Sequence, residues 1–391
     1  MRSILPVVFS FIFVTAFSLG AGTLLRLANK RIWHISFFDK AAKYLPYTGW
    51  LCFILFGAAY MFSINFMLPV AATGLAVLAI MSLILLLSLP FSLLVHSLHS
   101  KVKPVKREAI DPDKRRFLKT AAAIVPVLTL GTSTDGIASS FDDVRIPEIG
   151  FTYKDLPEDL DGFRIWHLSD LHLGYYFQLN NLEELLLRAE NKSFDLILIT
   201  GDVADDLSQL TDSLNLVDQM KTSYSPVVSL GNHEYYRGIK EVRRRIEASP
   251  IPLLVNNHFI YKIGNTNLTI AGADDPRRMH SDISQFLTNS ISMSMQNAPD
   301  NGFKILMSHR PNALNVAGQF GINLVLSGHT HGGQIGFNGQ SIFEPIAENA
   351  YLWGKYQKGQ TKLYTSSGVG HWFPFRLGCP AEAPIITLKK V

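Results

Sequence analysis

Five short polar motifs contain the residues of this sequence whose types suit metal chemistry. They are Asp170-Leu171-His172, Gly201-Asp202, Gly231-Asn232-His233-Glu234, Ser308-His309 and Gly328-His329-Thr330-His331. Imidazole with carboxylate suits zinc, iron or manganese, and carboxylate suits manganese or magnesium. Two divalent ions about 3.5–4 Å apart can stabilise both the attacking and the leaving oxygen of a displacement at phosphorus. The motifs therefore indicate a pair of divalent ions, with a shared carboxylate to hold their spacing.

Each motif follows an apolar run of the kind that forms a β-strand. The runs are residues 163–168, 195–200, 226–230, 303–307 and 322–326. Side chains at the ends of such strands can converge at one edge of a sheet, where α/β proteins place their sites. A single His or Asp at a strand end is usually a satisfied polar residue or a helix cap. Five in this pattern favour one common centre.

In this order the motifs resemble those of the calcineurin-like metallophosphoesterases, which read DxH, GDxxD, GNH(D/E), SH and GHTH. The match covers residues 145–391 and includes Asp205 in the second motif and Glu234 in the third. The resemblance implies an α/β fold in which two β-sheets form a sandwich flanked by helices. The alternation of strand-like and helical runs, taken alone, would also fit a doubly wound sheet.

The resemblance also implies a role for each matched residue. One ion would be bound by Asp170, His172 and His331. The other would be bound by Asn232, His309 and His329, with Asp202 bridging the two. His233 would contact the phosphoryl oxygens or protonate the leaving group, and water activated by the ions would be the nucleophile.

Other polar residues near the motifs have less certain partners. Asp205 is expected either to support Asp202 or to lie in solvent. Glu234 stands where some members of the family carry Asp, and its longer side chain would change the geometry if this acid orients His233, so its role stays open. Arg310 would face either a phosphate or solvent. Residues 274–278 are expected to form a charged loop near the site. The aromatic run at residues 368–375 would be either core packing or a surface that meets lipid or an acyl chain.

The front of the chain differs in composition from the rest. Residues 1–110 hold ten Lys and Arg but two acidic residues, whereas the remaining 281 hold 26 basic and 30 acidic residues. Long stretches without Asp, Glu, Lys or Arg predict membrane spans at residues 4–25, 47–68 and 70–95. Because the basic residues stand beside these apolar runs, they indicate a membrane protein and no nucleic-acid partner.

Basic residues at 26–43 and 101–119 predict how the chain crosses the membrane. Both clusters favour the cytoplasmic side, which places the N-terminus outside. Residues 114–119, Lys-Arg-Arg-Phe-Leu-Lys, resemble a twin-arginine export signal with Lys114 at the first arginine position, and apolar residues 120–131 follow. Used as a signal or a span, this segment would carry the remaining chain outward. The alternative is a docking helix that leaves it in the cytoplasm.

We therefore expect three parts in the chain. Residues 1–110 form a transmembrane region with three spans. Residues 111–144 hold the twin-arginine-like or fourth apolar segment and a linker, with linker character over residues 132–150. Residues 145–391 form the catalytic domain. Cys52 and Cys379 are too few for a disulfide framework.

The expected function is that of a multi-pass inner-membrane phosphoesterase with its catalytic domain outside the cytoplasm. It would use two divalent ions (Mn, Zn, Fe or Mg) to hydrolyse a phosphodiester, phosphomonoester or pyrophosphate bond. The substrate would be lipid-linked or part of the cell envelope. The alternatives are a tethered phosphodiesterase for soluble nucleotides and a non-catalytic sensor or scaffold that keeps the fold.

Overall fold

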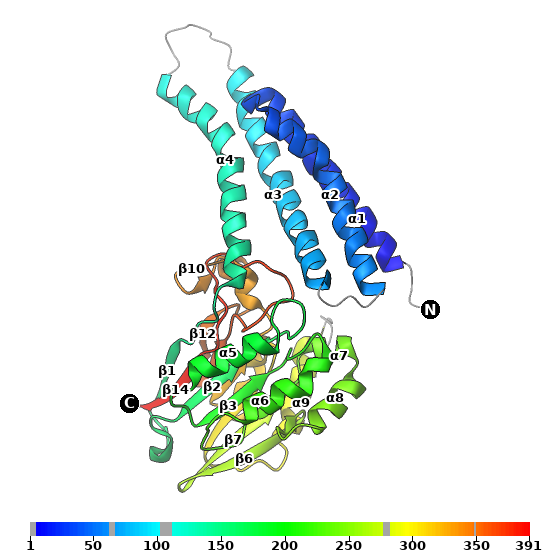
Figure 1. Ribbon diagram of the computed structural model, residues 1–391. Coiled ribbons are helices and arrows are strands. Elements are labelled where there is room, and N and C mark those ends of the chain that lie inside the picture. The colour runs from blue at the N-terminus through cyan, green and yellow to red at the C-terminus, as the bar shows by residue number, and fades with distance from the viewer. Residues whose placement is uncertain (1–4, 62–66, 102–111, 277–281, 348) are drawn as a thin grey trace. The chain divides into compact units, whose positions relative to one another are not determined.

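A computed structural model describes residues 5–61, 67–101, 112–276, 282–347 and 349–391 (Figure 1). The chain divides into two compact units. The helical unit contains Met1–Ala138 together with Phe373–Phe375. The sandwich unit contains Ser139–Trp372 and Arg376–Val391.

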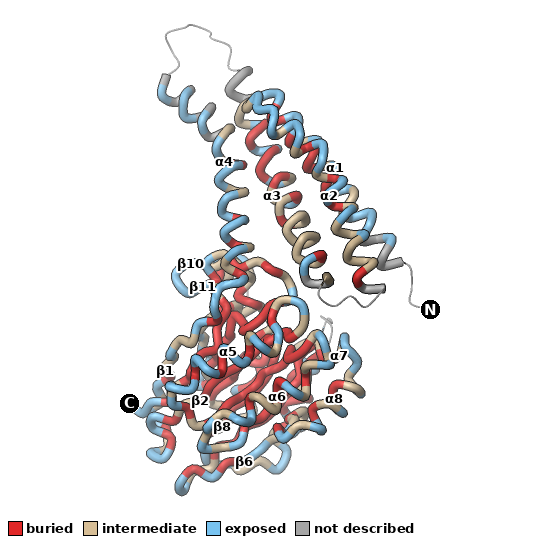
Figure 2. The backbone as a smooth tube through the Cα atoms, viewed as in Figure 1, coloured by how far each residue is buried: buried red, intermediate tan, exposed pale blue. Residues whose placement is uncertain are grey.

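The helical unit is built from long helices that pack through small and branched side chains. Its helices are α1 (Leu5–Ala28), the short π-helix η1 (Asn29–Trp33), α2 (Ser36–Met61), α3 (Met67–Lys101) and α4 (Pro112–Ala138). Ala21 and Ala28 of α1, Ala42 of α2 and Leu89 of α3 are buried in one cluster. Helix α4 packs along α3. Most of the described residues of these helices are exposed or half-buried (Figure 2).

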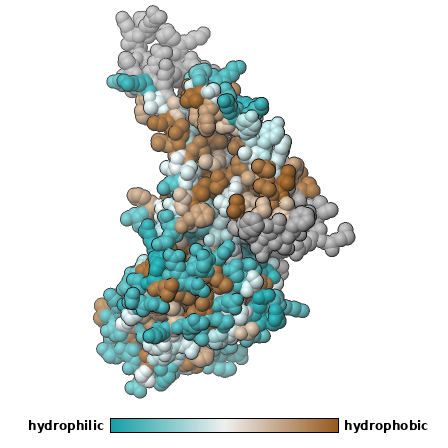
Figure 3. All heavy atoms as spheres, in the orientation of Figure 1, coloured by the Kyte–Doolittle hydropathy of each residue, from teal (hydrophilic) through white to brown (hydrophobic). Residues whose placement is uncertain are grey.

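Two helical segments among the described residues are long and apolar enough to cross a membrane, judged by length and composition. They are Phe11–Trp33 and Val70–Ser97, and 28% and 22% of their apolar windows are buried. A core helix would be mostly buried, so these segments offer apolar surface to their surroundings. Hydrophobic residues cover much of the visible face of this unit (Figure 3). Residues 47–61 of the expected span at 47–68 lie in α2. That this segment crosses a membrane stays a prediction.

The connection expected between the first two spans is largely helical. Arg26, Lys30 and Lys40 lie in α1, η1 and α2, and residues 34–35 make the turn. The side chain of Asn29 holds this turn, because it donates to the carbonyl of Ile35 and accepts from its N–H. The next basic stretch covers residues 101–119. Of these, residues 102–111 lie outside the described part of the chain.

The linker expected over residues 132–150 is wrong in part. Residues 132–138 continue α4, and residues 148–150 begin the first strand. Ser133 and Thr134 fit the helix because their hydroxyls donate to the carbonyls of Thr129 and Leu130, one turn earlier. These bonds let hydroxyl residues, which often mark loops, remain in a helix.

The sandwich unit consists of two six-stranded mixed sheets and a small hairpin. In spatial order the first sheet contains β1 (Glu148–Tyr153), β14 (Ile385–Lys390), β2 (Arg164–Leu168), β3 (Leu196–Thr200), β4 (Val227–Ser229) and β5 (Leu253–Leu254). The second contains β12 (Gly354–Lys358), β13 (Thr361–Thr365), β9 (Leu324–Ser327), β8 (Phe303–Met307), β7 (Thr266–Gly272) and β6 (Asn257–Ile263). The hairpin joins β10 (Gly336–Phe337) to β11 (Gln340–Ser341).

The main core lies between the two sheets. Ile165 and Leu198 of the first sheet and Ile270, Ile305 and Leu326 of the second are buried in one cluster. Helices then cover the outer faces. The first sheet carries α5 (Leu179–Ala189), α6 (Leu210–Asp218) and α8 (Ile239–Glu247), and the second carries α9 (Ile283–Ser294) and α10 (Leu314–Ala317). The expected sandwich flanked by helices is confirmed, and the doubly wound alternative is wrong.

Local sequence patterns account for several elements. Helix α5 buries Leu182, Leu185 and Leu186, as its spacing of apolar residues requires. Strands β6 and β7 pair antiparallel across the turn at Gly264 and Asn265. Helix α9 begins after Asp282, whose side chain accepts the N–H of Gln285 and so caps the helix.

Parallel pairing brings the ends of the central strands level. Strands β2, β3 and β4 run parallel in the first sheet, with Leu168 opposite Ile199 and Thr200 opposite Ser229. Strands β8 and β9 run parallel in the second, with Met307 opposite Leu326. Each of the five motifs begins where one of these strands ends.

Candidate metal centre

The five motifs meet at this common edge, so the predicted ligands come from both sheets. Asp170 follows β2, Asp202 follows β3, and Asn232 begins α7 (Asn232–Arg237) after β4. His309 follows β8 and His329 follows β9. All of them except His329, which is half-buried, are buried. Residues up to 159 positions apart in the chain are therefore in direct contact.

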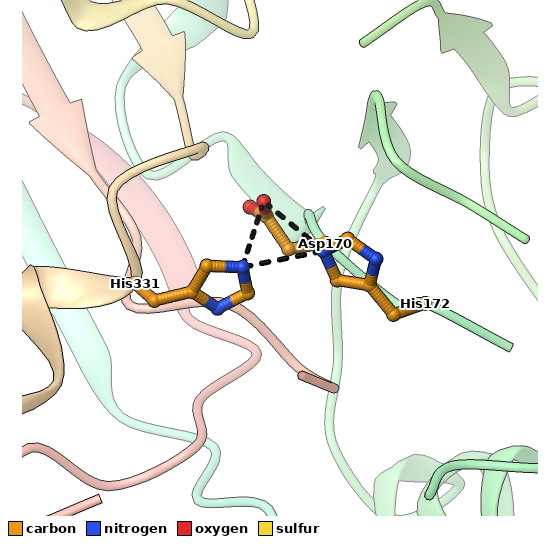
Figure 4. A group of neighbouring side chains, drawn as sticks. All are labelled: Asp170, His172 and His331. Carbon is orange, nitrogen blue, oxygen red and sulfur yellow. Dashed lines mark hydrogen bonds and ion pairs between the residues drawn. The ribbon is translucent and has the colours of Figure 1, made fainter. Parts of the chain in front are cut away.

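Asp170, His172 and His331 form the first group of donors. Their candidate ligand atoms lie within 4.8 Å of one another. Nε2 of His172 is 3.2 Å from Nε2 of His331, and the two nitrogens are 3.9 Å and 3.6 Å from Oδ1 of Asp170. Figure 4 shows both rings with a nitrogen turned toward this carboxylate. Two imidazoles and a carboxylate around one point suit a divalent transition metal.

Asp202, His309 and His329 form the second group, again with ligand atoms within 4.8 Å. Nδ1 of His309 lies 3.1 Å from the carbonyl of Thr200, which makes Nδ1 the donor and leaves the Nε2 lone pair toward the centre. Asn232 Oδ1 is buried and makes no hydrogen bond with any residue that the structure describes, and the buried His309 Nε2 has only ion-pair contacts there, with Asp202 and Asp170. Buried polar atoms without hydrogen bonds are costly, and a metal ion would satisfy both.

Asp202 lies between the two groups. Its Oδ2 is 3.1 Å from Nε2 of His309 and 3.7 Å from Nε2 of His172. Its Oδ1 accepts the backbone N–H of His233 at 2.9 Å. The carboxylate is thus fixed from the protein side and placed between both sets of donors, as a bridging ligand must be.

The backbone is strained at most of these positions. Asp170, His172, Asp202, His329 and His331 all have a positive φ, between 47° and 71°. Residues other than glycine rarely adopt this left-handed conformation, which persists mainly where function requires it. Here it turns the chain sharply at the end of a strand or within the motif that follows.

Two glycines of the motifs are required by close approach. A Cβ on Gly231 would overlap Oδ1 of Asp202, and a Cβ on Gly328 would overlap Oδ2 of Asp170. Any larger residue would push a carboxylate out of the centre. This explains why glycine stands directly before Asn232 and His329.

Asp205 connects a predicted metal ligand with the predicted catalytic residue. Its carboxylate lies 2.6 Å from Nδ1 of His233, 3.2 Å from Nδ1 of His172 and 3.0 Å from Nη2 of Arg237. Burial would raise the pKa of Asp205, but hydrogen bonds from His172 and His233 lower it well below its usual range. The expectation that Asp205 lies in solvent is wrong. The hydrogen bonds described for its carboxylate are with His172, His233 and Arg237, and not with Asp202.

Glu234 holds the backbone of the centre and does not orient His233. Its buried carboxylate accepts the N–H groups of Asp202, Val203 and Gly231 at 3.0, 2.8 and 2.7 Å. Burial, followed by the charge of Asp202, raises the pKa of Glu234. The sequence left the role of Glu234 open, and the structure shows that its carboxylate reaches back to the loops after β3 and β4.

Arg310 is buried, so the alternative that it faces solvent is wrong. Its Nε lies 2.8 Å from Oδ2 of Asp275, and its Nη1 lies 2.5 Å from Nε2 of His329. The charged loop expected at 274–278 therefore reaches the site through Asp275, while Arg277 and Arg278 lie outside the described residues. Whether Arg310 contacts a phosphate stays a prediction.

The charges of the centre divide its histidines into two kinds. Burial would lower the pKa of His309, but the carboxylates of Asp202 and Asp170 outweigh it and raise the pKa to about 10. The pKa of His172 is also raised, because Asp205 and its neighbours outweigh burial. Burial and adjacent positive charge lower the pKa values of His329 and His331 well below the ordinary value. Without metal, the carboxylates thus favour a proton on His309 and on His172, and a cation bound at the centre would displace it.

A cavity of about 480 Å³ opens beside the donors. Its wall includes Asp202, His233 and His331, together with Tyr236 and Trp372. The sequence did not single out Tyr236 or Arg237. The sequence could have indicated Arg237, because it stands four residues after His233 on one helix and so lies on the same face of that helix.

The aromatic run at 368–375 has a divided role. Val369, His371 and Pro374 are buried, and the N–H of Gly370 donates to the carbonyl of Asp170 at 2.7 Å. Trp372 is 57% exposed. Residues 368–370 therefore support the metal centre from behind, while Trp372 lines the cavity and is exposed. His167 and His258, two histidines outside the motifs, bond to Thr200 Oγ1 and to the carbonyl of Ser294.

Known proteins share this region of the chain. A family model described as calcineurin-like phosphoesterase matches residues 163–333, which contain all the predicted ligands. An uncharacterized metallophosphoesterase of Campylobacter jejuni is 30% identical over 256 residues, covering 64% of this chain and 66% of that protein. The Bacillus subtilis metallophosphoesterase YkuE, also uncharacterized, is 29% identical over 286 residues, covering 71% of this chain and 97% of YkuE.

Two further matches concern membrane context and fold. A Danio rerio protein named as a transmembrane protein with a metallophosphoesterase domain is 26% identical over 70% of this chain and 63% of its own length. The chain thus spans just under two thirds of the Campylobacter and Danio proteins. The solved structure of the calcineurin-like phosphoesterase YfkN from Bacillus subtilis has a TM-score of 0.37 and 16% identity, covering 53% of this chain and 82% of that one. The family model and the curated relatives agree, and this chain belongs to the calcineurin-like metallophosphoesterase family.

Proposed function

We propose that this protein is a hydrolase that cleaves a phosphodiester, phosphomonoester or pyrophosphate bond with the help of two divalent ions. The observation that carries the proposal is the pair of donor groups with Asp202 between them. Asp170, His172 and His331 would hold one ion, and Asn232, His309 and His329 the other. Ions bound there would supply Lewis-acid activation of water and neutralise charge on phosphoryl oxygens.

His233 would act on the substrate rather than on a metal. Its Nδ1 is taken by Asp205 at 2.6 Å, which fixes the ring and leaves Nε2 as the nitrogen that can meet the substrate. The side chain lines the cavity and is 15% exposed, so substrate can reach it. A proton on Nε2 would pass to the leaving-group oxygen as the ester bond breaks. Arg310 would add positive charge behind His329.

We further propose that the chain is a multi-pass inner-membrane protein whose sandwich unit lies outside the cytoplasm. The two apolar segments Phe11–Trp33 and Val70–Ser97 support membrane association. The basic clusters at 26–43 and 101–119 favour the cytoplasmic side, and α4 then carries the chain outward. The twin-arginine-like residues at the start of α4 fit the same direction of export.

A metal-by-substrate screen on the full chain in detergent tests the chemistry. Protein stripped with chelator would be reloaded with Mn, Zn, Fe or Mg and offered chromogenic monoesters and diesters, cyclic nucleotides and pyrophosphate compounds. We expect hydrolysis to return with metal, and to be absent from Asp202→Asn but present in the control Asp212→Asn, which changes a helix residue outside the donor groups. Metal binding without hydrolysis of any compound would instead favour a scaffold.

Protease accessibility in cells tests the orientation. With the outer barrier opened and the inner membrane intact, protease should digest the sandwich unit and spare residues 101–119. A sandwich unit protected until the inner membrane is lysed would place the enzyme in the cytoplasm and reject this part of the proposal.

A further inference from the structure

We propose that the sandwich unit contacts a lipid bilayer through an apolar rim beside the metal cavity, and that its substrates are phosphoesters carried by membrane lipids. The rim consists of Tyr236, Phe337, Ile342, Ile346 and Trp372. The substrate class rests on the hydrolase function proposed above, whereas the contact surface stands on the rim alone.

The rim exposes large apolar side chains in one region of the unit. The exposed fractions are 54% for Tyr236, 80% for Phe337, 50% for Ile342, 82% for Ile346 and 57% for Trp372. Single exposed apolar residues are common, but a group of them around a functional opening marks a contact surface. Tyr236 and Trp372 also line the cavity that contains Asp202 and His233.

The β10–β11 hairpin connects the rim to the cavity wall. Gly333 and Gln334 line the cavity, and the hairpin begins two residues later. Ile342 N–H donates to the carbonyl of Ile335 at 3.1 Å, and Gly336 N–H donates to that of Leu377 at 2.9 Å. The hairpin is therefore held by backbone bonds at its base, and Phe337 lies beside its Asn338-Gly339 turn.

Chain connectivity identifies the bilayer as the occupant. Helix α4 ends at Ala138, and the ring of Phe141 lies 6.0 Å from that of His371, the neighbour of Trp372. Ser139–Phe141 form a short 3-10 helix that rises only about 6 Å, so the chain enters the sandwich unit beside its rim. Helix α4 belongs to the helical unit, which also holds the apolar segment Val70–Ser97, so the chain enters the sandwich unit directly from the part that we propose lies in the membrane.

The composition of the rim fits the interface of a bilayer. Tyr and Trp prefer the headgroup level, and Phe and Ile contribute affinity by entering the acyl boundary. Residues 336–346 contain no Lys or Arg and one acidic residue, Glu344. The contact would therefore depend on apolar insertion rather than on anionic headgroups. A lipid phosphate near the membrane surface would reach the cavity without the lipid leaving the bilayer.

Depth-dependent fluorescence quenching tests the contact on the full chain. Ile346→Cys would be labelled with an environment-sensitive fluorophore and reconstituted in phosphatidylcholine vesicles with and without spin-labelled lipid. Ile260→Cys is the matched control, because Ile260 is 40% exposed on β6 at the sheet edge. The labelled parent chain, which retains Cys52 and Cys379, gives the background.

We expect strong quenching at position 346, little at position 260, and no dependence on added anionic lipid or salt. Equal quenching at the two positions, or none at position 346, overturns the proposal. An absence of quenching at position 346 in vesicles, together with a shielded label in native membranes, would mean that a second protein covers the rim, and it would also overturn the proposal.

A second experiment separates the rim from the chemistry. The double variant Phe337→Asp/Ile346→Asp should hydrolyse a vesicle-borne lipid phosphoester at least about tenfold more slowly, because two apolar contacts with the bilayer are lost. It should hydrolyse a soluble chromogenic ester at the parental rate, as should the control Phe259→Asp on both substrates. Equal loss on both substrates by the double variant would count against a bilayer role. If the parent hydrolyses no ester, the hydrolase function fails, and the quenching result still decides the rim.

Discussion

Asp205 and His233 form a 2.6 Å hydrogen bond between the carboxylate and Nδ1, and the same carboxylate lies 3.2 Å from Nδ1 of His172. One side chain thus orients both a proposed metal ligand and the proposed proton donor. Because an ionised carboxylate can only accept, each imidazole must present its Nδ1 hydrogen to Asp205. The Nε2 atoms of both rings are then available to the centre and to the cavity.

We expect Asp205→Asn to weaken metal binding about 10–100-fold, the usual cost of losing a carboxylate behind a ligating histidine. Turnover should fall as well, because His233 loses its orientation. Metal titration and steady-state kinetics on the same preparation would measure both effects. The control is Asp206→Asn, since Asp206 caps a short helix next to Asp205 and asparagine can also cap. Parental metal affinity in Asp205→Asn would show that the contact does not matter.

His233 and Asn232 are adjacent, yet they should behave differently. His233→Ala should retain its metals and turn over about 10²–10⁴-fold more slowly, the usual effect of losing a general acid. Asn232→Ala should instead lose affinity at the second site, because Asn232 Oδ1 has no other partner among the described residues. Elemental analysis beside kinetics separates the two. Loss of metal from His233→Ala would mean that the division between ligand and catalyst is wrong.

Asp202→Asn should cost more activity than any other ligand change, because Asp202 is the proposed bridge and its Oδ2 lies 3.1 Å from His309 and 3.7 Å from His172, one histidine of each donor group. Protein purified without chelator should contain close to two metal ions per chain, and the variant should contain fewer. Full activity with a single bound ion would contradict the dinuclear mechanism.

Metal binding should strengthen as pH rises. The pKa of His309 in the metal-free protein is raised to about 10, so its ring carries a proton at neutral pH that a metal must displace. Affinity should increase about tenfold per pH unit for each displaced proton, and the increase should end near the raised pKa. Calorimetry near neutral pH in two buffers of different ionisation enthalpy would detect the released protons. His258→Gln should leave the release unchanged, and His309→Gln should reduce it.

The place of the proposed ligands in the fold was predictable because its signals are local. Each motif stands where an apolar run ends, so strand periodicity and residue type placed Asp170, Asp202, Asn232, His309 and His329 at one edge. Glu234 could have been assigned from a local pattern as well. It stands three residues after the helix cap Gly231, the spacing at which a carboxylate reaches back to backbone N–H groups.

Contacts between distant segments could not be predicted in this way. Arg310 and Asp275 are 35 residues apart, and their pairing depends on how the loop after β7 meets the end of β8. The final turns of α4 were also missed, because Ser133 and Thr134 look like loop residues until their hydroxyls bond within the helix.

Each donor group draws on both sheets of the sandwich. Asp170 and His172 meet His331 at one site, and Asp202 meets His309 and His329 at the other. Each ion would therefore act as a crosslink between the two layers, in addition to its chemical role. Since a ligand that binds only the folded state stabilises it, the thermal stability of the sandwich would depend on metal concentration. Metal scarcity would then lower the amount of intact enzyme as well as its rate.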